Sequence, residues 1–117
     1  MHLVAPGHDR ESGGGLVVEL DTRRLFEEVL GCKWTLAILD ALAAGVARPG
    51  KLRRAMTGLT SKVLQDRLRK LERFELVKRE LVAQKPLHVE YRLTRKGREL
   101  SRIASRLRGF ADRWSAE

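Results

Sequence analysis

Residues 48–94 have the sequence RPGKLRRAMTGLTSKVLQDRLRKLERFELVKRELVAQKPLHVEYRLT, and this stretch decides the fold. It predicts a short helix over residues 49–56, a tight turn over 57–59 and a longer, very basic helix over 60–73. Gly58 permits the positive φ that a sharp turn needs, and a threonine at the start of the second helix can cap it. Helix, turn and helix in this order are typical of a DNA-binding helix-turn-helix.

Two strand-like runs follow, residues 76–82 and 89–94, and a polar loop around residues 85–88 joins them. One face of this hairpin is apolar except for Arg79, which should need an acid such as Glu90 or a phosphate as its partner. A helix-turn-helix followed by a β-hairpin is a winged helix, whose second helix enters the DNA major groove. The predicted fold class is therefore mainly α with a small β part (α+β).

The longer helix has two different faces. Its leucines recur within about 40° of one another at 100° per residue, so they should face the core. The N-terminal part of a recognition helix meets base edges, where Gln can bond adenine, Lys can donate to guanine and Asp can accept from cytosine. We predict that the base-reading residues are Ser61, Lys62, Gln65, Asp66 and Arg69. Asp66 either meets a base or orients a neighbouring cation on the helix, and both alternatives stay open.

Other cations and one hydroxyl of the helix-turn-helix are better placed for phosphates, which fix the register of a protein on DNA rather than read its sequence. The predicted backbone contacts are Lys51, Arg53, Arg54, Thr60, Lys70 and Arg73. In the hairpin loop, Lys85 and His88 are predicted to form a wing tip that contacts the DNA backbone or the minor groove.

The net charge of +9 is concentrated in this same stretch. Residues 46–98 carry sixteen Lys/Arg against five Asp/Glu, whereas residues 1–45 carry four against seven. A concentrated positive surface favours a polyphosphate partner. The alternative, a merely solvated charged surface, usually mixes both signs.

The N-terminal part of the chain is expected to support the helix-turn-helix. Residues 1–20 contain a glycine triplet and predict a flexible segment, although Leu16–Leu20 could add a short strand; residues 21–117 are predicted to form one domain. Asp21 or Thr22 should cap a first helix.

That first helix should end or bend at Gly31. Residues 33–44 are apolar nearly all round, which predicts a second helix at the centre of the domain. Trp34 in this helix is expected to be a core residue. Residues 46–48 could pair with the hairpin as a small strand.

A last helix should begin at the cap Thr94, and its apolar stripe runs for about four turns. A stripe left over after the winged helix is complete suggests a subunit interface with the first helix, and the alternative is that it folds back on its own domain. The predicted interface residues are Leu25, Phe26, Val29, Ile103, Leu107, Phe110 and Trp114. A two-fold dimer would place two recognition helices on a pseudo-palindrome.

Several classes of protein are disfavoured. No apolar run approaches the roughly 18 residues of a membrane span, no signal peptide is recognisable, and a single cysteine forms no internal disulfide. We therefore expect a cytoplasmic, nucleoid-associated protein. His2, His8 and His88 alone could act as general bases near neutral pH, and no catalytic, metal or cofactor motif appears at usable spacing. The sequence thus predicts no enzyme.

Several spaced motifs resemble those of HxlR-type winged-helix regulators. The residues that carry the resemblance are Gly31-Cys-Lys-Trp-Thr-Leu-Ala-Ile-Leu39, Leu52-Arg-Arg-Ala55, Gly58-Leu-Thr-Ser61, the Leu64, Leu68, Leu71, Glu72 series and Val89-Glu-Tyr-Arg-Leu-Thr94 with Gly97. It covers about residues 21–114. The resemblance implies a prokaryotic DNA-binding transcriptional regulator, homodimeric through its first and last helices and without catalytic activity.

Two positions depart from the family pattern. Many relatives carry a sensing cysteine just before the first helix, where this sequence has Asp21 and Thr22, so the resemblance implies that this switch is absent. Cys32 replaces the second glycine of the signature. Near Lys33 and a helix start it could act as a redox sensor, or it is a small buried hydrophobe beside Trp34.

The predicted function is a homodimeric, sequence-specific transcriptional regulator that represses by blocking polymerase. Its predicted partners are double-stranded DNA and a second copy of itself. The alternative is a winged helix used for protein interaction or for non-specific, architectural DNA binding. The sequence leaves open whether a small-molecule effector binds near the aromatic residues of the interface.

Overall fold

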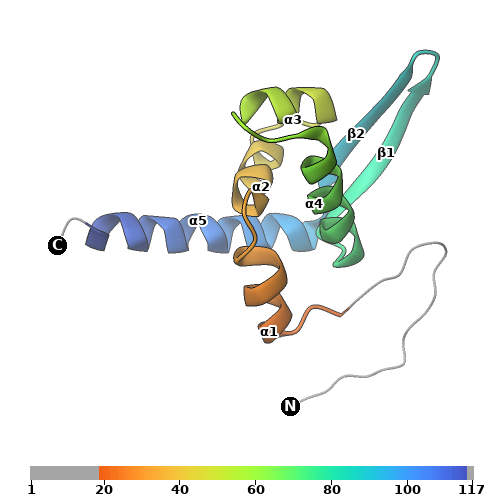
Figure 1. The fold of residues 1–117 in the computed structure, drawn as a ribbon. Helices are drawn as coiled ribbons and strands as arrows, with labels where there is room; N and C mark the ends of the chain where they lie inside the picture. Colours follow the sequence, from red (N-terminus) through yellow and green to blue (C-terminus); the bar gives the residue numbers. More distant parts are fainter. Residues whose placement is uncertain (1–18, 116–117) are drawn as a thin grey trace.

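The computed structural model describes residues 19–115, which form a helical domain with one small sheet (Figure 1). Of the predicted flexible segment, residues 1–18 lie outside the described residues, and with them most of the possible strand Leu16–Leu20; Glu19 and Leu20 belong to no helix or strand. The elements are α1 (Thr22–Arg24), η2 (Leu25–Leu30), α2 (Thr35–Ala43), α3 (Pro49–Ala55), α4 (Ser61–Arg73), β1 (Val77–Gln84), β2 (Leu87–Leu93) and α5 (Arg95–Ser115). Helix, turn, helix and antiparallel hairpin follow one another in the predicted order, so the winged helix-turn-helix fold is confirmed.

Side-chain caps start three of the helices at the predicted residues. Asp21 accepts a hydrogen bond from the backbone N–H of Arg24 at 2.8 Å, and the Thr60 hydroxyl accepts from that of Val63 at 3.2 Å. The Thr94 hydroxyl likewise accepts from the N–H of Gly97 at 3.0 Å. Each cap satisfies a donor that the first helical turn leaves unpaired, which fixes where the helix begins.

The core lies between α2, α4 and the base of the hairpin. The three leucines predicted to face inward from α4, Leu64, Leu68 and Leu71, are all buried. They pack in one cluster with Ile38 and Leu39 of α2 and with other buried side chains, among them Leu52, Phe74 and Leu76. This cluster fixes the position of α4, so the opposite, polar side of α4 faces outward.

The hairpin is longer and its turn tighter than predicted. The strands pair antiparallel from Val77 and Leu93 out to Gln84 and Leu87, so only Lys85 and Pro86 remain in the turn. The register is irregular between Leu81 and Ala83. The predicted four-residue loop was wrong. The outer residues of the two strands are mostly exposed, so their sequence does not alternate between apolar and polar residues in the way that marks a half-buried strand.

The start of α2 and the segment that follows it differ from the predictions. It begins at Thr35 rather than at residue 33, because Trp34 has φ of 78°, a left-handed conformation that a right-handed helix cannot include. Residues 46–48 form no strand: the Ala47 carbonyl accepts one hydrogen bond from the Tyr91 N–H at 2.8 Å. Helix α2 ends at Ala43, close to the predicted residue 44, and Gly45 follows with φ of 98°.

The first helix winds unusually. After one α-helical turn it continues as a π-helix, in which the Gly31 N–H donates to the Phe26 carbonyl at 2.9 Å, and it ends at Leu30 as expected. This wide turn points Val29 into the core, where it is fully buried, and leaves Phe26 58% exposed. Farther along the chain, Ala37 of α2 and Ala55 of α3 are exposed.

Helix α5 crosses the domain and then leaves it (Figure 1). Its first half is anchored by the buried residues Gly97, Leu100, Ser101 and Ala104. At Gly97 the helix lies so close to the preceding chain that a Cβ atom there would be 1.9 Å from the Leu76 carbonyl oxygen. The second half projects away with its apolar side chains exposed. No helix among residues 19–115 is long and apolar enough to span a membrane.

Candidate nucleic-acid interface

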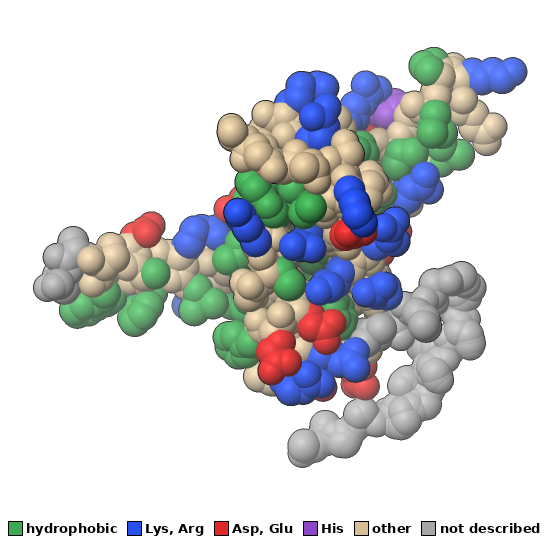
Figure 2. All heavy atoms as spheres, viewed as in Figure 1, with side chains coloured by type: hydrophobic (Ala, Val, Ile, Leu, Met, Phe, Trp, Pro, Cys, Tyr) green, Lys and Arg blue, Asp and Glu red, His purple; other side chains and the backbone are tan. Residues whose placement is uncertain are grey.

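A groove of about 690 Å³ lies between α3, α4 and the hairpin. Its cationic lining consists of Arg48, Lys51, Arg54 and Arg79, and no Asp or Glu is among the described residues that line it. Figure 2 shows Lys and Arg side chains over α3 and along the outer side of α4. We call this surface the basic groove. Cations gathered without acids on one side of a domain attract a polyanion.

The predicted base-reading residues lie along α4, from Ser61 in its first turn to Arg69 in its third. Gln65 lines the basic groove, while Ser61 and Lys62 are exposed at the start of the helix. Asp66 forms an ion pair with Arg69 at 2.8 Å and lies 3.9 Å from the Lys62 amine. The orienting role considered for Asp66 therefore has a geometric basis, since its carboxylate pairs closely with Arg69 and lies near Lys62.

The predicted backbone contacts divide into two groups. Lys51, Arg53, Arg54 and Arg73 are exposed. Thr60 is exposed as well, but its hydroxyl already caps α4. Lys70 points elsewhere, because its Nζ lies 3.6 Å from the Cys32 Sγ.

Cys32 is half-buried between the first helix and α4. Its thiol donates to the Glu28 carbonyl at 3.2 Å, and its cationic neighbour is Lys70 rather than the expected Lys33. The Lys33 amine lies over the Trp34 ring instead, 5.3 Å from its centroid. Sequence proximity was misleading here because the left-handed Trp34 turns the chain between residue 32 and the start of α2.

The sequence left two partners open for Arg79 of β1, an acid such as Glu90 or a phosphate. Arg79 lies opposite Tyr91 in the sheet, and both line the basic groove. Of these two partners, Glu90 is engaged by His88 and Arg92 instead, while Arg79 lines the groove. Burial, together with the nearby charge of Glu72, raises the pKa of Tyr91 above its ordinary value, so the phenol stays neutral. In the sequence, Arg79 stood out as a cation on an otherwise apolar strand face.

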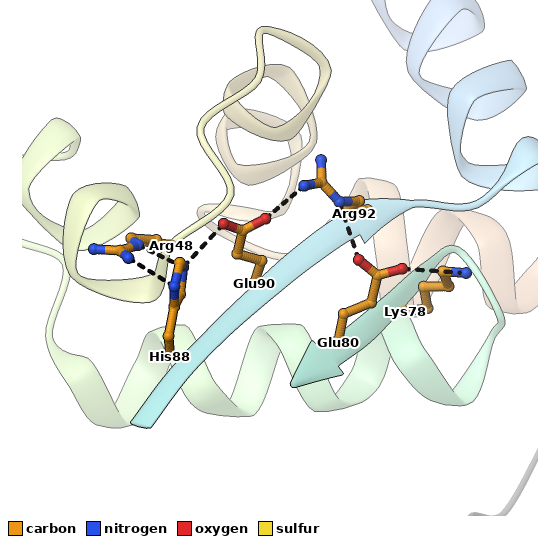
Figure 3. A network of polar contacts seen from close by, with 6 residues as sticks. All are labelled: Arg48, Lys78, Glu80, His88, Glu90 and Arg92. Carbon is orange, nitrogen blue, oxygen red and sulfur yellow. Dashed lines mark hydrogen bonds and ion pairs between the residues drawn. The ribbon is translucent and has the colours of Figure 1, made fainter. Parts of the chain in front are cut away.

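A network of polar contacts joins the hairpin to the start of α3 (Figure 3). Two nitrogens of the Arg48 guanidinium lie 2.7 and 2.8 Å from the ring nitrogens of His88. The His88 Nε2 is 2.9 Å from a Glu90 oxygen, and the other Glu90 oxygen accepts from Arg92. Arg92 also reaches Glu80 at 3.1 Å. His88 is therefore not at the wing tip, as predicted, but in β2, where it holds the hairpin against α3.

Lys78 completes this network on β1, 3.3 Å from Glu80. Hydrogen bonds from Lys78 and from Arg92 hold the pKa of Glu80 below its ordinary value. A carboxyl whose pKa is lowered on folding stabilises the fold above its unfolded pKa and loses that contribution as the pH falls through the folded pKa. The ion pairs of Glu80 thus contribute at neutral pH and are lost under acidic conditions.

Replacing Glu90 by glutamine should weaken DNA binding about fivefold, equivalent to roughly 1 kcal/mol. Removing an acid from a basic surface would by charge alone strengthen binding. Here the opposite is expected, because the Glu90 carboxylate positions both His88 and Arg92, and through His88 also Arg48. Fluorescence anisotropy with a labelled duplex measures the effect. Glu75→Gln removes an exposed acid outside the network and should leave affinity unchanged or higher; a rise for both variants would contradict the positioning role.

Most of the predicted interface residues are exposed, but two are not. Phe26, Ile103, Leu107, Phe110 and Trp114 are between 46% and 60% exposed. Figure 2 shows hydrophobic side chains along one edge of the projecting α5. Leu25 is half-buried, and the fully buried Val29 is a core residue that a partner subunit could not reach.

Comparisons with known proteins agree with this geometry. The model of the HxlR-like helix-turn-helix family matches residues 29–117. An uncharacterized HTH-type transcriptional regulator of Bacillus subtilis, YvaP, is 32% identical over 87 residues, which are 74% of this chain and 81% of YvaP. Another, sll1512 of Synechocystis sp., is 33% identical over 87 residues, which cover 74% of this chain and 64% of that protein.

Solved structures show the same fold. The reduced form of the transcriptional regulator YodB from B. subtilis superposes with a TM-score of 0.67 at 30% identity, covering 74% of this chain and 85% of YodB. Sequence, fold and the basic groove point to one family. The chain belongs to the HxlR-like helix-turn-helix family of DNA-binding transcriptional regulators.

Proposed function

We propose that this regulator acts as a homodimer on a pseudo-palindromic operator in the cytoplasm, at the nucleoid, and represses by excluding polymerase. The observation that carries the proposal is the exposed stripe of Ile103, Leu107, Phe110 and Trp114 on α5. A contiguous apolar surface of this kind on a small domain marks an interaction site. Two copies joined through α5 and Phe26 would present two α4 helices related by a two-fold axis.

Within each half-site, the start of α4 would read bases and the basic groove would follow the phosphate backbone. The proposed readers are Ser61, Lys62, Gln65 and Arg69, with Asp66 orienting the two cations among them. Arg48 and Arg79 join Lys51 and Arg54 as phosphate contacts, since all four line the groove. Arg53 and Arg73 extend this positive surface, and Lys85 at the hairpin turn would contact the backbone or minor groove beside it.

Selection from a random duplex library near physiological salt tests this proposal. Enrichment of an inverted repeat with half-sites about one helical turn apart is the expected outcome. Uniform, steeply salt-dependent binding would instead support an architectural role that rests on phosphate contacts alone. Absence of binding would favour the alternative of a protein-interaction module. A reporter gene placed behind the selected operator then separates repression from activation.

Gln65→Ala and Arg54→Ala should have different signatures on the selected operator. Loss of Gln65 should relax base preference at one position, at a cost of roughly 1–3 kcal/mol on the preferred sequence only. Loss of Arg54 should weaken binding to every duplex and lower the salt slope by about one. Binding isotherms at several salt concentrations, on preferred and mismatched duplexes, measure both. If Gln65→Ala lowered the affinity for all duplexes equally, Gln65 would not be a base-reading residue.

A further inference from the structure

We propose that a cleft between α2, β2 and α5 binds a small organic carboxylate. The cleft has a volume of about 370 Å³, at the lower end of the range of small-molecule sites. It is lined by the end of α2, the last residues of β2 and the first turns of α5. We call it the α5 cleft.

The lining of the α5 cleft combines cations with an apolar wall. Three arginines contribute to it, Arg92, Arg98 and Arg102, and no acid is among its described lining residues. Leu42 and Leu93 supply apolar surface from α2 and β2. Ser101, which is otherwise buried at 7% exposure, also lines the cleft. An apolar wall with a few convergent polar groups is typical of small-ligand sites.

The charges in the cleft identify the class of ligand. Within residues 19–115, neither Arg98 nor Arg102 forms an ion pair with an acid, whereas Arg108, farther along the same helix, pairs with Asp40 at 2.7 Å. Arg98 is held along the wall by a hydrogen bond to the Leu93 carbonyl at 3.2 Å. A guanidinium matches a carboxylate with two parallel N–H donors. A carboxylate with a small apolar body would satisfy both the arginines and the leucines.

The α5 cleft is separate from the DNA surface, because it shares no lining residue with the basic groove. A phosphate that follows α4 and α3 would therefore not fill it. Bare phosphate would also leave the apolar wall unused. These two points favour an organic anion over the DNA backbone as the occupant.

Arg92 connects the cleft to the DNA-binding surface. Its guanidinium faces Glu80 at 3.1 Å and also pairs with Glu90, which holds His88 and, through it, Arg48 at the start of α3 (Figure 3). A carboxylate in the cleft would compete with these two acids for Arg92 and loosen the hairpin from α3. Ligand and DNA would then weaken each other's binding reciprocally. This coupling, unlike the site itself, rests on the proposed DNA-binding function.

Titration of the isotopically labelled protein with benzoate, followed by NMR, tests the site. Saturable shifts of the Leu42, Leu93 and Ser101 amides are expected, with a Kd on the order of millimolar. Arg102→Gln should weaken binding about tenfold, whereas Arg106→Gln, one turn away and outside the cleft, should change it less than twofold. Neutral benzamide should not bind. Absent or unsaturable shifts, equal binding of benzamide or of inorganic phosphate, or an unaffected Arg102→Gln variant would each overturn the proposal.

The coupling is measured separately, with the selected operator. Benzoate near saturation should lower DNA affinity several-fold in the parent protein and in Arg106→Gln, and leave Arg102→Gln unchanged. If benzoate binds and DNA affinity stays the same, the link through Arg92 is overturned while the site stands. If no duplex binds at all, the proposed function fails, and the NMR titration still decides the site.

Discussion

Gly97→Ala is expected to destabilise the domain by about 3 kcal/mol or more, the upper range for overpacking in a core. The added Cβ would lie 1.9 Å from the carbonyl oxygen of Leu76 and 2.9 Å from its carbonyl carbon. Both are backbone atoms, so no side-chain rotation can relieve the contact. Helix α5 would have to move away from the residue that precedes β1. Urea unfolding, followed by the midpoint and the slope, measures the loss.

Gly109→Ala in the same helix is the matched control. A Cβ there would meet only the end of the Arg113 side chain, at 3.9 Å. Alanine favours a helix interior over glycine, so this variant should be more stable by about 0.5–1 kcal/mol. If both variants gained stability, the close approach of α5 to Leu76 would not exist in solution.

Leu107→Glu is expected to convert the proposed dimer into a monomer and to lower operator affinity at least a hundredfold. Leu107 is 49% exposed in one subunit, so the substitution should leave the fold intact. A two-fold interface would bring two such carboxylates into one apolar contact, where neither is solvated. A monomer would also lose the second half-site. Sedimentation equilibrium and operator titration measure the two effects.

Ser105→Glu adds the same charge to the same helix as a control. Ser105 is exposed and lies about 160° around α5 from Leu107, at 100° per residue. It should neither dissociate the dimer nor weaken DNA binding beyond about twofold. A Leu107→Glu protein that stays dimeric would show that the apolar stripe is not the interface, and a parent protein that sediments as a monomer would lead to the same conclusion.

Local chemistry made much of this fold predictable. The leucines of α4 mark its buried face, Thr60 and Thr94 cap the helices that follow them, and Gly58 adopts the positive φ of the turn. Each of these signals lies within a few residues of the element that it determines.

The features that sequence reasoning missed depend on contacts between distant residues. Trp34 adopts a left-handed conformation that its own sequence does not favour, and it packs against the core from there. Arg48 and His88 are 40 positions apart, so the residues next to each of them in the sequence do not predict the contact. Glu90 was one possible partner of Arg79, but it pairs with His88 and Arg92 instead. Several basic residues compete for few acids along this hairpin, and the strand register decides which of them meet.

The junction between the hairpin and α5 has a mechanical consequence. A single residue, Thr94, separates the end of β2 from a helix of 21 residues, and its hydroxyl ties the junction to the Glu75 carbonyl at 2.6 Å. A straight helix of that length measures about 30 Å, close to one turn of DNA. The hairpin and α5 should therefore move together as one rigid unit. In a dimer joined through α5, the length of this helix would set the distance between the two wings. A small change in the angle at which the two helices pack would therefore change that distance.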